Sequence, residues 1–134
     1  MSKISRKGLI RKLDRIFSEY IRKRDANKKG LVKCISCKKE YHFTEVDAGH
    51  FISRKEMSIR YHPKNVHAQC RFCNRFRYGM QYVYSLELEK KEEGLPKHLY
   101  NLSKKTTKYT MSDLQDLVDL YQDLLKKENK RLSL

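Results

Sequence analysis

Two short segments, CISC (Cys34–Cys37) and CRFC (Cys70–Cys73), decide how this chain folds. Each segment places two cysteines with two residues between them, so one tight turn can present both thiols to a metal ion. Four thiolates supply the tetrahedral sulfur shell that zinc prefers, and a closed shell leaves no position for a reacting water. The sequence therefore predicts a structural zinc site at Cys34, Cys37, Cys70 and Cys73.

The composition is strongly basic. The 134 residues include 31 Lys and Arg against 16 Asp and Glu, which gives a formal net charge of +15. Nucleic acid is the first expected partner, because a protein that neutralises phosphates releases their counterions. The length predicts one domain, residues 1–134. The mean hydropathy of −0.84 predicts a lean core that bound zinc would help to stabilise.

The sequence gives no sign of a membrane or secretory destination. The N-terminal residues MSKISRKG are charged and lack the apolar region of a secretory signal. No run approaches the roughly 20 apolar residues that cross a bilayer. The basic N-terminal segment has no Trp, and the chain has no lipidation motif, which argues against a membrane partner. We expect a cytoplasmic protein, whose cysteines bind metal rather than form disulfides.

Apolar residues at helical spacing mark both ends of the chain. A basic helix is expected over residues 1–29, ending near Gly30, with an apolar stripe from Leu9 to Ile21. A last helix is expected from about Ser112 to Lys130, with Gln115 at its capping-box position and a stripe over 114–125. We expect the two stripes to pack on each other within one chain. The alternative is that the second stripe forms a homodimer interface.

The middle of the chain mixes strand and helix patterns. Short strands are expected over 31–53, a loop at Pro63 and Asn65, and a helix from Cys70 to about Glu93. This helix is expected to break at Gly79 and to end at Gly94 and Pro96. The fold class is therefore α+β. A zinc-stapled core (31–80) would lie between the basic N-terminal helix (1–30) and a helical C-terminal region (81–134).

The stretch DAGHFISR (Asp47–Arg54) lies between the cysteine pairs. His50 is a natural general base, and Asp47 offers the oxygen ligand that Mg²⁺ or Mn²⁺ prefers. Residues three apart on a regular strand point to opposite faces. A bulge at Ala48 and Gly49 would return both side chains to one side, and Gly49 would let a DNA backbone approach. If Asp47 binds metal, this bulge is required; if Asp47 does not bind metal, it instead holds a loop together.

An acid and a His, then an Asn, then CxxC followed by Asn resembles the HNH, or ββα-metal, endonucleases. The closer resemblance is to the lambda NinG family, also called Rap, of phage recombination nucleases. It covers the chain up to about Gly94, and DAGH between two CxxC pairs is its specific part. The matching segments are LDRIFSEYIRKRD (Leu13–Asp25), CISC, DAGHFISR and RYHPKNVHAQCRFCN (Arg60–Asn74).

The resemblance implies a small zinc-stapled ββα-metal core with a catalytic site. His50 would be the general base, and Asn65 would orient His50 through its side-chain amide. Asn74 would bind the catalytic Mg²⁺ or Mn²⁺ together with Asp47. HNH sites usually place the metal-binding acid directly before the His, where this chain has Gly49.

Each of these residues also has a structural interpretation. His50 could be a buried, hydrogen-bonded histidine. Asn65 could cap the turn after Pro63, and Asn74 could cap a helix. His62 and His67 are spare candidates, which we expect to be structural or to contact phosphate.

The resemblance implies a metal-dependent DNA endonuclease that acts on branched intermediates of phage recombination, such as D-loops and Holliday junctions. A homodimer and other phage or host recombination proteins are further expected partners, in the host cytoplasm. The competing interpretation is a non-catalytic zinc-stabilised module that binds nucleic acid. It explains the charge and the cysteines, but not why four polar residues fall at nuclease positions. The expected contacts to the DNA backbone are Arg54, Lys55, Arg71, Arg75 and Arg77.

Overall fold

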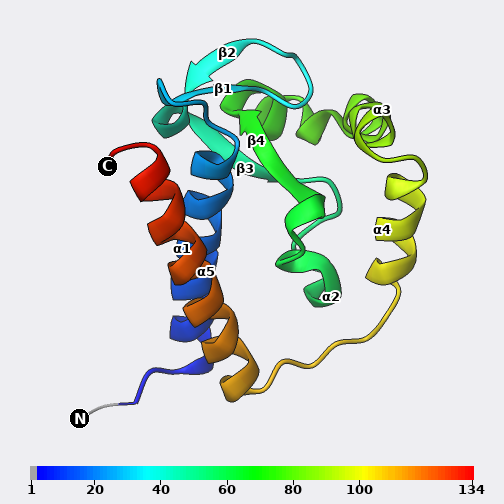
Figure 1. Ribbon diagram of the computed structural model, residues 1–134. Helices are drawn as coiled ribbons and strands as arrows, with labels where there is room; N and C mark the ends of the chain where they lie inside the picture. Colours follow the sequence, from blue (N-terminus) through cyan, green and yellow to red (C-terminus); the bar gives the residue numbers. More distant parts are fainter. Residues whose placement is uncertain (1–2) are drawn as a thin grey trace.

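The structure is a computed structural model that describes residues 3–134 (Figure 1). Long helices from the two ends of the chain lie on one side, and the strands and shorter helices lie beside them. The helices are α1 (Arg6–Arg24), α2 (Met57–Arg60), α3 (Gln81–Lys91), α4 (Leu95–Ser103) and α5 (Met111–Arg131). The strands are β1 (Leu31–Lys33), β2 (Glu40–His42), β3 (Val46–His50) and β4 (Val66–Cys70). Short helical turns are η1 (Phe43–Glu45), η2 (Pro63–Asn65), η3 (Phe72–Phe76) and η4 (Tyr78–Met80).

The two apolar stripes pack on each other, as the sequence predicts. Leu13 and Phe17 of α1 share a buried cluster with Leu114, Val118 and Tyr121 of α5. The rings of Phe17 and Tyr121 meet edge to face, with centroids 4.7 Å apart. Because Leu114 and Val118 are fully buried by this packing, the stripe is used inside the chain and is not free as an interface.

The helix that was expected over 1–29 is shorter than predicted. Ser5 caps its start, accepting a hydrogen bond from the Gly8 N–H at 3.0 Å, so α1 begins at Arg6. Asp25 ends it, because its carboxylate accepts a hydrogen bond from the Ala68 N–H on β4 at 2.8 Å. Gly30, with φ of +80°, shapes the turn into β1 rather than the helix end.

The C-terminal helices also differ in detail from the prediction. The capping box of α5 is formed by Thr110 and Asp113, in place of Ser112 and Gln115. The sequence prediction missed α4, where Gly94 is the N-cap residue with φ of +80° and Pro96 lies in the first turn. These two residues therefore begin a helix, whereas the one before has already ended at Lys91 with Glu92 as its C-cap.

β3 and β4 form a regular antiparallel pair that runs from Val46 opposite Cys70 to His50 opposite Val66. Each β3 residue has one partner on β4, so the bulge expected at Ala48 and Gly49 is absent. α1 covers one face of this pair, where Ala48 packs against its apolar stripe. β1 and β2 form a second small antiparallel pair.

The helix that was expected to start at Cys70 starts later and is preceded by irregular turns. Cys70 is the last residue of β4, and the next residues form the π-helical turn η3. Three successive residues, Tyr78, Gly79 and Met80, then have φ of +53°, +79° and +50°. The break at Gly79 is therefore confirmed, and α3 begins only at Gln81.

The core is divided into separate clusters, in keeping with the low hydropathy. Besides the α1–α5 cluster, Tyr84 and Leu88 of α3 pack with Leu95 and Leu99 of α4 and with Ile59 of α2. The thiols form a further cluster near the end of β4. No helix within residues 3–134 is long and apolar enough to cross a membrane.

Candidate metal centre and arginine-lined pocket

The four cysteines converge as the sequence predicts. Their sulfur atoms all lie within 4.8 Å of one another, and the Sγ atoms of Cys37 and Cys70 are 3.8 Å apart. A tetrahedral zinc site with Zn–S bonds of 2.3 Å has sulfurs about 3.8 Å apart. Lys38, with φ of +67°, closes the first turn by donating its N–H to the Cys34 carbonyl at 3.0 Å. The donor set therefore fits a structural zinc ion.

Hydrogen bonds around Cys34 favour its thiolate. Burial opposes the charge, but the Ser36 hydroxyl and nearby backbone N–H groups outweigh it and lower the pKa of Cys34 to about 6. Ser36 lies 3.3 Å from the Cys34 sulfur and accepts a hydrogen bond from the side chain of buried Gln69 at 3.1 Å. Sequence reasoning missed Ser36 and Gln69, since a Ser inside CxxC and a Gln on a strand carry no signal by themselves.

Gly49 has a different function from the one that was expected. It is buried, and a Cβ atom at this position would overlap the side chain of Gln69 on β4. Gly49 therefore makes room for Gln69, which also donates to the Gly79 carbonyl at 2.8 Å. The expected approach of a DNA backbone to Gly49 is not supported.

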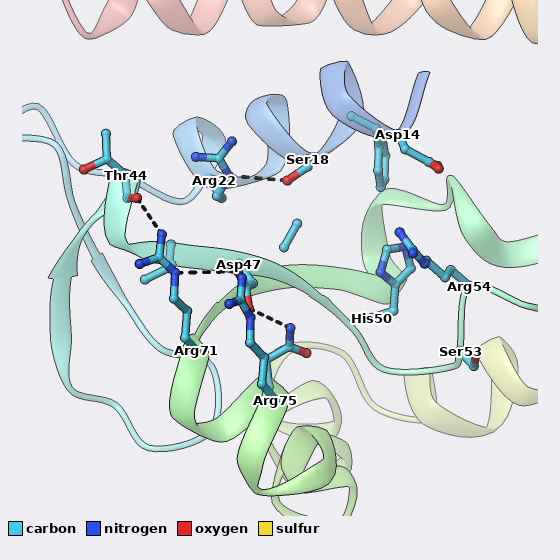
Figure 2. A pocket seen from close by; sticks show the side chains of 14 residues that line it. Asp14, Ser18, Arg22, Thr44, Asp47, His50, Ser53, Arg54, Arg71 and Arg75 are labelled. Carbon is cyan, nitrogen blue, oxygen red and sulfur yellow. Dashed lines mark hydrogen bonds and ion pairs between the residues drawn. The ribbon is translucent and has the colours of Figure 1, made fainter. Parts of the chain in front are cut away.

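A pocket of about 620 Å³ opens between α1, β3 and η3 (Figure 2). Its walls carry four arginines and two aspartates, so a basic environment surrounds it. Phe17, Val46 and Ala48 supply apolar wall, and Ser18, Thr44 and Ser53 supply hydroxyls. The charged and site residues that line it are Asp14, Arg22, Asp47, His50, Arg54, Arg71, Asn74 and Arg75.

Asp47 holds one end of this pocket together (Figure 2). Its carboxylate accepts two hydrogen bonds from Arg75, at 2.9 and 2.8 Å, and one from the Asn74 Nδ2 at 2.9 Å. The Nε of Arg71 lies 3.9 Å away. Asp47 therefore ties β3 to η3, which is the loop-holding function considered above as an alternative. Asp47 and Asn74 nevertheless come together, and Asp47 and His50 line the same pocket without the bulge that was expected to be required.

His50 lies toward the other end of the pocket, near Arg54 (Figure 2). Its Nε2 is 3.0 Å from the carbonyl oxygen of Arg60. A carbonyl can only accept, so Nε2 carries the proton and Nδ1 is left unprotonated. Burial is the main cause that lowers the pKa of His50 below 6.5, despite the favourable Arg60 carbonyl. The imidazole is therefore neutral at pH 7 and able to accept a proton.

The residue that supplies this carbonyl is itself fixed to α1. Both carboxylate oxygens of Asp14 accept hydrogen bonds from the Arg60 guanidinium, at 3.1 and 2.6 Å. The Tyr61 hydroxyl donates to Asp14 at 2.8 Å. Sequence reasoning missed Asp14 and Arg60, because their pairing depends on the packing of α1 against a distant loop.

Asn65 is buried and holds the loop that follows His50. Its Oδ1 accepts from the Ile52 N–H at 2.9 Å, and its Nδ2 donates to the Ile52 carbonyl at 3.0 Å. The amide was expected to orient His50, but its hydrogen bonds go to Ile52, two residues further along the chain. Any effect of Asn65 on the imidazole is therefore transmitted through the backbone.

The remaining predicted residues divide between pocket and surface. Arg54, Arg71 and Arg75 line the pocket, whereas Lys55 and Arg77 do not. Arg22 of α1 lines it as well, and no sequence pattern distinguishes Arg22 from the many other basic residues of that helix. Ser18, Thr44 and Ser53 were likewise not predicted.

The spare histidines lie apart from both centres. His62 caps η2, where its Nδ1 accepts from the Lys64 N–H at 3.2 Å. His67 contacts the Tyr84 hydroxyl, with Nδ1 at 3.4 Å. Burial lowers the pKa of His67 to about 4. Both contacts agree with the structural interpretation of these histidines.

Fold and site define a basic protein of mixed helix and strand, with a cluster of four cysteines that could hold a metal ion and an arginine-lined pocket. A family model described as Bacteriophage Lambda NinG protein matches residues 2–131, nearly the whole chain. The chain therefore belongs to the NinG family, and the match extends past Gly94 into the C-terminal helices. No curated protein and no solved structure matches the chain.

Proposed function

We propose that this protein is a metal-dependent DNA endonuclease, which hydrolyses phosphodiester bonds in branched intermediates of phage recombination, such as D-loops and Holliday junctions. One observation carries the proposal: the neutral His50 lines the same basic pocket as Asp47 and Asn74. The recombination context rests on membership of the NinG family. A homodimer and contacts with other phage or host recombination proteins belong to the same proposal, as does action in the host cytoplasm.

The pocket has the charge that a phosphate needs. Four arginines against two aspartates leave it cationic, and guanidinium groups bind phosphate oxygens in pairs. The side chains of Arg75 and Arg71, which both contact Asp47, are 58% and 52% exposed to solvent. Both side chains can therefore turn toward a ligand. We therefore propose that the DNA phosphates are bound by Arg22, Arg54, Arg71 and Arg75.

His50 would take a proton from the attacking water. Its Nδ1 is unprotonated because the Arg60 carbonyl holds the proton on Nε2. As the water oxygen bonds to phosphorus, its proton passes to Nδ1, and the resulting imidazolium is stabilised by the Arg60 carbonyl. The 3′ oxygen is the leaving group and must gain a proton from solvent.

Asp47 and Asn74 would hold the catalytic metal. The Asp47 oxygens and the Asn74 Oδ1 are hard donors that suit Mg²⁺ or Mn²⁺, and water and a phosphate oxygen would complete the shell. When bound, such an ion stabilises the negative charge that develops on the phosphate and the leaving oxygen. Arg75 contacts the same carboxylate, so it would have to move from Asp47 toward the phosphate.

The test is cleavage of end-labelled linear duplex, single strand, D-loop and four-way junction with Mg²⁺, Mn²⁺ or a chelator. His50→Ala should slow metal-dependent cleavage at least about a hundred-fold, which is the usual value of a general base. His62→Ala is the matched control, because His62 lies outside the pocket, and it should cut like wild type. Equal cleavage by wild type and His50→Ala would refute the function of His50.

A non-catalytic zinc-stabilised module that binds nucleic acid remains the second candidate. One observation favours it: Arg75 and Asn74 already satisfy the Asp47 carboxylate without any metal. Tight DNA binding with no cuts under any metal, together with intact zinc content, would establish this candidate in place of the nuclease.

A further inference from the structure

The segment Phe72–Tyr82, which runs from η3 into the first turn of α3, carries four aromatic side chains in solvent. The exposed fractions are 58% for Phe72, 72% for Phe76, 90% for Tyr78 and 76% for Tyr82. By contrast Tyr84, two residues further on, is fully buried. We name the four exposed residues the aromatic surface. Burial of large apolar rings stabilises a fold, so rings left in water forgo that stabilisation. A concentration of such rings in one segment is therefore typical of a binding surface.

Arginines alternate with these rings along the chain. Arg71 precedes Phe72, Arg75 precedes Phe76, and Arg77 precedes Tyr78. Arg71 and Arg75 line the pocket, while the Arg77 guanidinium lies 5.8 Å from the centre of the Phe72 ring. The Phe72 and Phe76 rings are 6.3 Å apart. The Phe72 and Phe76 rings of the aromatic surface are therefore carried by the same turn, η3, as Arg75 of the pocket wall.

The backbone beneath the aromatic surface is held in an unfavourable conformation. Tyr78 and Met80, on either side of Gly79, have φ of +53° and +50°. A left-handed conformation costs a non-glycine residue energy, and such conformations gather at functional sites. Tyr78, which lies in this left-handed stretch, is the most exposed of the four rings.

We infer that the aromatic surface stacks on unpaired bases of a DNA whose backbone lies in the arginine-lined pocket. In an intact duplex the faces of the bases are covered by their neighbours, so only unpaired or branched DNA exposes them. Aromatic rings stack on any base and arginines hold the phosphates, which is the usual combination for single-stranded DNA. The inference rests on the proposed function for DNA as the ligand, and it adds a physical reason for preferring interrupted duplexes.

A second copy of this chain is the weaker candidate for the aromatic surface. Each copy carries a formal net charge of +15, and three arginines are interleaved with the rings. Bringing two such surfaces together would place like charges side by side, whereas DNA supplies the opposite charge.

The experiment measures binding with no divalent metal added, so that cleavage does not enter. One probe is a labelled duplex, and the other is the same duplex with a short unpaired stretch that contains 2-aminopurine. The variants are Phe76→Ala/Tyr82→Ala and Phe76→Leu/Tyr82→Leu. Tyr100→Ala is the matched control, because Tyr100 is an exposed ring of α4 that pairs with Lys104 at 4.7 Å.

Wild type should bind the interrupted duplex about ten-fold more tightly than the intact one and quench its 2-aminopurine, as base stacking predicts. Both double variants should lose the preference and the quenching but bind the intact duplex within about two-fold of wild type. Tyr100→Ala should behave like wild type. Circular dichroism would verify that the variants are folded.

Three results would overturn the inference. The first is an unchanged preference in Phe76→Ala/Tyr82→Ala. The second is an unchanged preference and quenching in Phe76→Leu/Tyr82→Leu, which would mean apolar contact rather than stacking. The third is concentration-dependent self-association of wild type that the double variants abolish. If the protein binds DNA but does not cleave it, the nuclease proposal fails and these binding readouts still test the stacking. If wild type binds neither DNA, the nuclease proposal and the stacking proposal are both refuted.

Discussion

Asp14 on α1 and Arg60 at the end of α2 are joined by two hydrogen bonds, and the backbone of Arg60 in turn holds His50. The N-terminal helix therefore positions the proposed general base indirectly, through the hydrogen bonds of Asp14 to Arg60 and of Arg60 to His50. Arg60 is 16% exposed and Asp14 is 25% exposed, so the pair is shielded from water on most sides.

Asp14→Asn should destabilise the fold by about 1–2 kcal/mol and slow DNA cleavage. The change removes the negative charge of Asp14, which accepts hydrogen bonds from Arg60 and Tyr61. Arg60 is then held less firmly, and its carbonyl can move away from His50. Urea unfolding and cleavage rates are the measurements. Lys64→Gln is the control: it breaks the exposed pair with Glu92 and should leave the unfolding midpoint in place. Unaltered stability of Asp14→Asn would contradict this account.

Removal of zinc should unfold the middle of the chain. Cys37→Ser should abolish zinc binding and cost several kcal/mol, because the thiol cluster joins the β1 region to the end of β4. Zinc content and thermal unfolding by circular dichroism are the measurements, and Co²⁺ should give the spectrum of a tetrahedral thiolate site. Ser36→Ala keeps all four thiols and should retain zinc with reduced affinity. Zinc content equal to wild type in Cys37→Ser would exclude this cysteine as a ligand.

His67 should make stability depend on pH. Burial lowers its pKa from 6.5 to about 4 in the folded state, so between these values the unfolded chain binds more protons. Stability is then fully present above about pH 6.5 and falls as pH drops toward 4, by up to about 3 kcal/mol. Unfolding of wild type and His67→Gln across this range, with zinc in excess, measures the effect. The free energy of unfolding of His67→Gln should depend less steeply on pH than that of wild type. Parallel curves for the two proteins would contradict the assignment of this pH dependence to His67.

The α1–α5 packing should carry much of the stability. Leu13→Ala removes a fully buried side chain from α1 and should cost about 2–5 kcal/mol. Leu120→Ala is the control on α5, since Leu120 is 48% exposed, and it should cost less than about 0.5 kcal/mol. Urea unfolding at several protein concentrations is the measurement. A midpoint that rises with concentration would indicate that the stripe also serves a dimer.

Sequence reasoning succeeded where the signal is local. The spacing of Cys34 and Cys37 is read within one turn, and the apolar stripe of α1 within one helix. It failed where tertiary packing decides. The Asp14–Arg60 pair joins residues distant in the chain, and Gly49 is required by Gln69 on the neighbouring strand rather than by a bulge.

The missed helix has a similar cause. Gly94 and Pro96 were expected to end a helix, yet both residue types also begin helices, and α4 starts between them. The break at Gly79 was predictable because glycine there permits a positive φ. The positive φ of Tyr78 and Met80 was not, since both residue types disfavour it.

The pairing of α1 with α5 also has a consequence for how the chain is made. A ribosome produces α1 before α5, so α1 can pack against β3 and β4 while the α5 side of its apolar stripe is still uncovered. Until α5 emerges, Leu13 and Phe17 are only partly covered, on a helix that also carries many of the basic residues. A translation product that stops before α5 would keep this face open and be prone to aggregation or proteolysis. Burial of the α1 stripe, and with it the stability of the helix that carries Asp14, thus depends on a segment that is synthesised much later.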